Sequence, residues 1–98
     1  MIQPRFLPAA QAELLTEVAY YSQSRDGLGI RFEAAVARAV DLATRQPEAG
    51  VPGPHGTRSR IVKGFPFSVV YRASGDTLLV VALAHHRRKP GHWATRLA

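Results

Sequence analysis

The sequence predicts an α+β fold in the order β-α-α-β-β-β, in which a helical hairpin packs on one face of a mostly antiparallel sheet. Apolar residues recur at helical spacing through residues 9–46, whereas from residue 57 onward they alternate as they do in strands. A stretch with three glycines and two prolines, residues 48–56, separates these two patterns and is expected to be a loop. The 98 residues, of which 46% are hydrophobic, are expected to form one domain over residues 1–98.

The first strand and the first helix follow from two prolines and one apolar stripe. Residues 2–7 can form a strand, and Pro4 must then lie at a sheet edge or near the strand start, because proline cannot donate to the ladder. Pro8 suits the first turn of a helix that continues to about Ser22. The stripe that this helix is expected to bury comprises Ala10, Leu14, Val18 and Tyr21. The polar residues expected on its surface are Gln11, Glu13 and Glu17.

A second helix is predicted after a turn over residues 24–29. The residues expected on its buried face are Phe32, Val36, Ala39 and Ala43. The helix should end at Gln46, because Pro47 disfavours helical backbone at the residue before it. Two successive helices of this kind pack as a hairpin and need a sheet to cover.

Three strands are predicted in the second half, over residues 57–63, 65–72 and 77–84. The last of them is apolar on both sides, which is typical of a strand at the centre of a sheet. The alternation of the first two predicts that the sheet has one apolar and one cationic face. The residues expected under the helices are Ile61, Phe67, Val69 and Tyr71, and those expected on the opposite face are Arg58, Arg60 and Arg72. Such a cationic face is either a solvated surface or a binding surface.

The net charge of +6 is unevenly placed along the chain. Residues 1–50 hold five arginines and six acids, a net −1, whereas residues 51–98 hold eight Lys or Arg and the single acid Asp76, a net +7. This polarity predicts an acidic partner, either nucleic acid or an acidic protein segment. The chain has no cysteine, which excludes disulfides and thiolate zinc sites. Its apolar runs fall short of the ~20 residues of a membrane span and no signal-like segment begins it, so we expect no membrane association and a cytoplasmic location.

The last predicted strand runs into a cluster of cations and histidines, His85-His86-Arg87-Arg88-Lys89-Pro90-Gly91-His92-Trp93. Because like charges repel, this crowding indicates a partner outside the fold. His85 or His86 could act as an acid or base near neutrality, or simply make a strand-end contact. We expect no cofactor, and no metal site either, because adjacent strand residues point to opposite faces and no carboxylate lies nearby in the sequence. Trp93 could close the core or bind a partner.

The element order and several motifs resemble the ParE/RelE superfamily of toxins from bacterial toxin–antitoxin modules. The resemblance covers nearly the whole chain, and its second half is most similar to the ParE branch. The residues that carry it are Glu13-Leu14, Tyr20-Tyr21, Gly29 to Phe32, Gln46-Pro47, Arg60, Phe65-Pro66-Phe67-Ser68-Val69-Val70-Tyr71-Arg72, the run from Ala84 to Trp93, and Arg96.

The resemblance implies a toxin that a cognate ParD-like antitoxin with an acidic tail holds inactive, with a role in plasmid stabilisation. Freed ParE-like members poison DNA gyrase, block replication and arrest growth, whereas RelE-like members cut mRNA in the ribosome. Fold alone cannot choose between these targets. A non-toxic binding module that kept the fold is a third alternative.

The two targets make different demands on the residues. For ribosome-dependent mRNA cleavage, the candidate catalytic residues are Arg58, Arg60, His85, His86 and Arg87. Ser68, however, follows Phe67 at a position where the ribonuclease branch typically carries an arginine. The sequence therefore favours a gyrase inhibitor that acts by contact, without an active site of its own. The residues expected to bind the antitoxin or the target are Arg58, Arg60, Arg72, His86, Arg87, Arg88, Lys89 and Trp93.

Overall fold

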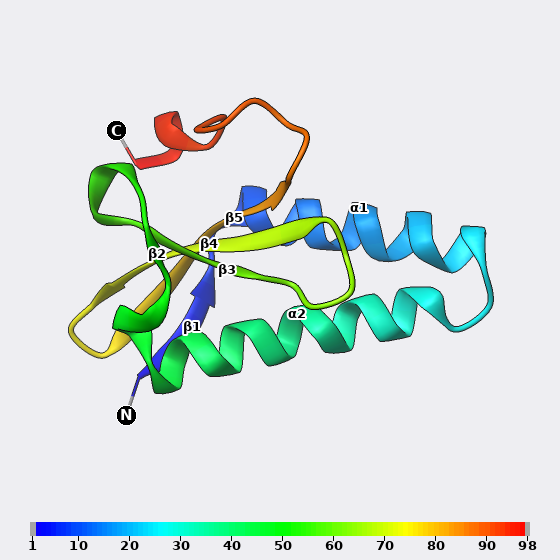
Figure 1. The fold of residues 1–98 in the computed structure, drawn as a ribbon, viewed down its shortest axis with the longest axis horizontal. Coiled ribbons are helices and arrows are strands. Elements are labelled where there is room, and N and C mark those ends of the chain that lie inside the picture. The colour runs from blue at the N-terminus through cyan, green and yellow to red at the C-terminus, as the bar shows by residue number, and fades with distance from the viewer. Residues whose placement is uncertain (1, 98) are drawn as a thin grey trace.

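The computed structural model describes residues 2–97 and confirms the predicted α+β fold (Figure 1). Its helices and strands are β1 (Gln3–Phe6), α1 (Pro8–Ser24), α2 (Leu28–Arg45), β2 (Val51–Pro52), β3 (Arg58–Ile61), β4 (Phe67–Ser74) and β5 (Thr77–His85). Three short 3₁₀ helices lie at Pro47–Ala49 (η1), Pro54–Gly56 (η2) and Ala94–Leu97 (η3). None of the helices within residues 2–97 has the length and apolar character needed to cross a membrane.

The five strands form one mixed sheet in the order β1-β5-β4-β3-β2. β5 lies between β1 and β4, which confirms that the doubly apolar strand is interior to the sheet. β1 pairs with β5 in parallel and the other pairs are antiparallel. β1 is an edge strand with a neighbour on one side only. The missing backbone N–H of Pro4 therefore interrupts no pairing with a second neighbouring strand.

One strand was absent from the sequence prediction. The predicted loop over residues 48–56 contains β2, whose Val51 and Pro52 pair antiparallel with Ser59 and Arg58. Two residues between glycines and prolines carry no periodicity, so only pairing with β3 identifies them as a strand.

The main core lies between the two helices and the sheet. Ala10 and Leu14 of α1 are buried there, as are Phe32 and Val36 of α2, which confirms the predicted helical stripes. Side chains of this size contribute roughly 1.5–3 kcal/mol each when fully buried. The helix side of the sheet adds Phe67, Val69, Tyr71, Leu78, Val80 and Leu83.

A second, smaller core lies on the other side of the sheet. Trp93 is only 6% exposed and packs there with Val70, Val81 and Ala82. Val70 pairs with Ala82 and Tyr71 with Val80, so Val81 is the extra residue of a β-bulge. The C-terminal segment, residues 86–97 (orange to red in Figure 1), thus returns over the sheet and buries its tryptophan against it.

The predicted faces of β3 were wrong. Arg58 pairs with Tyr71 and Arg60 with Val69, which places both arginines on the helix side of the sheet. Ile61 pairs with Ser68 on the other side and is 69% exposed. A period of two fixes which residues share a face but not which face meets the helices.

Arg72 was placed correctly on the face away from the helices. It pairs with Leu79, which packs against the second core. Of the three arginines expected on the face away from the helices, Arg72 lies there, whereas Arg58 and Arg60 do not.

Candidate functional site

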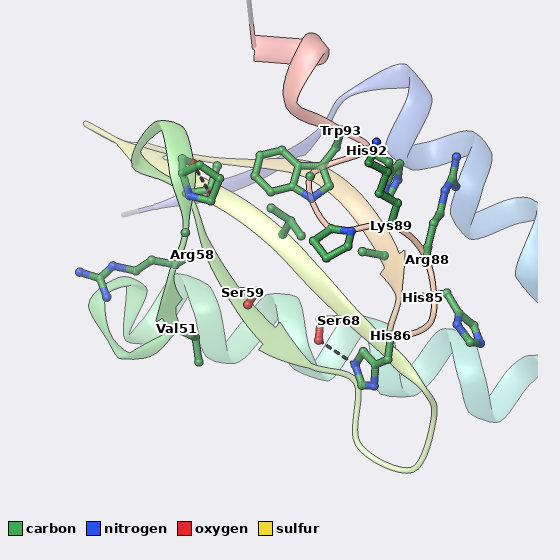
Figure 2. Close-up of a pocket in the computed structure, with 17 residues that line it drawn as sticks. Val51, Arg58, Ser59, Ser68, His85, His86, Arg88, Lys89, His92 and Trp93 are labelled. Carbon is green, nitrogen blue, oxygen red and sulfur yellow. Dashed lines mark hydrogen bonds between the residues drawn. The ribbon is translucent and has the colours of Figure 1, made fainter.

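A hollow of about 410 Å³ opens on the sheet face away from the helices (Figure 2), and we call it the groove. The residues that line it are Val51, Gly53, Pro54, Thr57, Arg58, Ser59, Ser68, Val70, Ala84, His85, His86, Arg88, Lys89, Pro90, Gly91, His92 and Trp93. They come from β2 to β5 on one side and from the C-terminal segment on the other. The groove thus brings cations and histidines of residues 85–93 next to β2 and β3, which come much earlier in the chain.

Strand register builds the floor of the groove. Val51 pairs with Ser59, and Ser59 pairs with Val70, so the three side chains form a row across β2, β3 and β4. Ser68 pairs with Ala84 of β5 on the same face. The C-terminal segment adds the buried indole of Trp93 as a wall. Apart from two serines, this part of the groove is apolar.

The rim of the groove is cationic. His86, Arg88 and Lys89 are exposed, and none of the described residues that line the groove is Asp or Glu. His86 Nε2 lies 2.9 Å from the hydroxyl oxygen of Ser68, and its backbone N–H donates to the Pro66 carbonyl. These two bonds hold the imidazole over β4. Ser68, the residue after Phe67, is therefore the polar partner of His86.

The structure separates the five candidate catalytic residues. Arg58 points away from the groove and donates to the Gly50 carbonyl at 2.9 Å (Figure 2). The His85 ring packs edge-on against Phe67, with centroids 4.9 Å apart, on the helix side. Arg60 is also on that side, and its Nε is buried without a hydrogen-bond partner among the described residues. Of the histidines and arginines in this set, only His86 has its functional end at the groove, because Arg87 is exposed and does not line it.

Glu13 is the residue that the sequence reasoning missed. It was expected on the surface, yet its side chain is only 16% exposed and its carboxylate holds the C-terminal segment. Arg96 forms a two-pronged pair with it at 2.8 and 3.0 Å, and His92 lies 3.2 Å away. Arg88 approaches the same carboxylate at 3.5 Å. Part of the cation cluster is therefore compensated inside the fold.

Glu13 and Arg96 also complete the edge of β5. β1 pairs with β5 only as far as Val80. Beyond that point, the Leu83 N–H donates to Glu13 at 3.1 Å and Arg96 donates to the Val81 carbonyl at 3.0 Å. Two side chains thus satisfy backbone groups that the short edge strand leaves free.

These contacts set the charge state of Glu13. Burial alone would raise the pKa of its carboxyl, but hydrogen bonds from Arg96, the Leu83 N–H and His92 favour the ionised form. The result is a pKa below the ordinary value. The hydrogen bond to Glu13 likewise raises the pKa of the Arg96 guanidinium.

Known proteins match this chain in family and in fold. The family described as "ParE toxin of type II toxin-antitoxin system, parDE" matches residues 5–90. A solved structure described as "Chromosomal ParDE TA system from P. aeruginosa" superposes with a TM-score of 0.72 at 17% identity. The match covers 87% of this chain and 96% of that chain, and at this identity it supports the fold. No curated protein matches the chain.

Proposed function

Because this chain belongs to the ParE toxin family of type II toxin–antitoxin systems, we propose that it inhibits DNA gyrase by protein–protein contact. In the absence of its antitoxin, it would stop replication by binding the enzyme. The toxin would need no catalytic group of its own for this action.

The separation of the candidate catalytic residues supports contact over RNA cleavage. Cleavage by an adjacent 2′-hydroxyl needs a base, an acid and cations gathered around one phosphate. His86 could supply one of these functions at the groove, but the Arg58 guanidinium turns away to the Gly50 carbonyl and Arg60 lies on the helix side of the sheet. His85 is packed on Phe67 and faces away from His86. This arrangement is the observation that carries the proposal.

A cognate antitoxin is the second part of the proposal. The +7 charge of residues 51–98 complements an acidic protein segment. We expect an adjacent small reading frame that encodes a ParD-like protein with a DNA-binding domain and an acidic, amphipathic tail. Neutralisation would then be a binding equilibrium between the two chains.

Mapping the ends of DNA and of mRNA in cells that express the toxin alone tests the target. We expect growth arrest with DNA breaks at gyrase sites and intact messages. Codon-registered cuts in translated messages that are lost in Arg87→Ala would instead identify the ribosome as the target of the toxin. Normal growth would instead identify a binding module without toxicity.

A further inference from the structure

We propose that the groove binds a peptide segment in which an apolar side chain lies next to carboxylates. This proposal rests on the proposed function in one respect, since it takes the antitoxin as the protein that supplies the segment. It adds where on the toxin the segment binds and which side chains recognise it.

The charges of the groove rim call for an anionic ligand. Lys89 forms no ion pair within residues 2–97, and Arg88 reaches Glu13 only at 3.5 Å. Glu13 itself is saturated by Arg96, His92 and the Leu83 N–H. The fold therefore compensates one end of the cluster and leaves the groove end open to a partner's carboxylates.

The floor of the groove calls for an apolar group on the same ligand. Val51 is 68% exposed, although it lies in a strand and in register with the buried Val70. Ala84 and Trp93 continue this apolar surface. An apolar side chain seated here would remove Val51 from water, which a simple anion cannot do.

Size and stacking favour a peptide over nucleic acid. Protein sites of about 300–1,000 Å³ hold small ligands, and at about 410 Å³ the groove suits one or two side chains of an extended chain. Single-stranded nucleic acids bind through exposed aromatic rings on which bases stack. Trp93 is buried against the sheet and His86 is bonded to Ser68, so the groove offers no such platform among its described residues.

The test uses random twelve-residue peptides displayed on phage and selected on the immobilised full-length chain. We expect the enriched peptides to carry an apolar residue within two positions of Asp or Glu. Binding of one synthetic winner, measured by fluorescence anisotropy, should weaken about tenfold with Val51→Ser and with Lys89→Glu. Both positions are exposed, so these variants should keep the thermal unfolding midpoint of the parent.

Two matched controls lie on α2, away from the groove. Ile30→Ser removes an apolar side chain that is 73% exposed, and Arg38→Glu reverses an exposed cation. Both should bind the peptide as the parent does. Enrichment without acids, equal losses in the controls, or displacement of the peptide by a single-stranded oligonucleotide would overturn the proposal. Gyrase is absent from this assay, so a toxin that leaves gyrase untouched refutes the proposed function without changing these outcomes.

Discussion

Glu13 joins the first helix to the last residues of the chain through one carboxylate. Its partners Leu83 and Arg96 are 70 and 83 residues away in sequence. Helical periodicity counts apolar positions only, so it assigned Glu13 to the surface beside the correctly predicted Leu14. The residues near Glu13 in the sequence give no indication that its partners lie 70 or more residues away. The cation cluster was visible in the sequence, but the acid that holds one end of it was not.

Replacing Glu13 by glutamine should lower the free energy of unfolding by about 1–3 kcal/mol. The amide keeps the shape but loses the charge-assisted hydrogen bonds to Arg96 and His92, and residual solvent at the site limits the loss. Urea unfolding followed by the fluorescence of Trp93, the one tryptophan of the chain, measures it. Asp41→Asn is the control, because Asp41 pairs with Arg45 at an exposed position and should cost less than about 0.5 kcal/mol. Equal losses in the two variants would contradict the role given to Glu13.

The stabilisation by Glu13 should depend on pH in one direction. Its pKa is lowered in the folded state, so the unfolded chain binds this proton more readily and stability rises with pH across the transition. The contribution should be fully present above the ordinary value of 4.5 and should be lost as pH falls through the folded-state pKa below it. The gap between parent and Glu13→Gln in unfolding free energy, measured over a pH series, should therefore close on acidification. A gap that stays constant well below pH 4.5 would contradict this.

At the scale of elements, the sequence predicted the type and order of the helices and long strands. Long stretches with a helical or alternating apolar periodicity specify these elements. Pro8 marks where α1 begins, and Pro47 marks where α2 ends. The face of β3 could not be predicted in the same way, because its alternation fixes which residues share a face but not which face meets the helices. β2 is two residues long and is formed only through its pairing with β3. Of the groove, the sequence indicated the C-terminal cations but not the apolar floor, which several strands build jointly.

The helical hairpin depends on a close approach at Gly29. A Cβ there would lie 2.7 Å from the Val18 carbonyl oxygen and would also collide with the Ser22 hydroxyl. Gly29→Ala should therefore lower the unfolding free energy by about 1–3 kcal/mol, although alanine favours helices by up to ~1 kcal/mol. Thermal unfolding compared with the exposed neighbour variant Ile30→Ala, expected to be near neutral, measures the effect. A stabilised Gly29→Ala protein would show that α1 and α2 can move apart without cost.

On the scale of the whole molecule, the two faces of the sheet differ in how much they bury. Its helix side holds the main core, while its other side carries a small core around Trp93 and the open groove beside it. Glu13 fixes the C-terminal segment at one end, and the exposed cations occupy the groove end. We therefore expect the strand that runs into the His85–Trp93 cluster to supply a contact surface, since the five candidate residues for RNA cleavage are not gathered at one place beside it.

The most direct test of this account is the supercoiling of relaxed plasmid by purified DNA gyrase in the presence of the purified toxin. We predict loss of supercoiling or accumulation of cleaved plasmid, and reversal of either effect by the cognate antitoxin. Full gyrase activity at toxin concentrations that arrest growth would contradict the central claim.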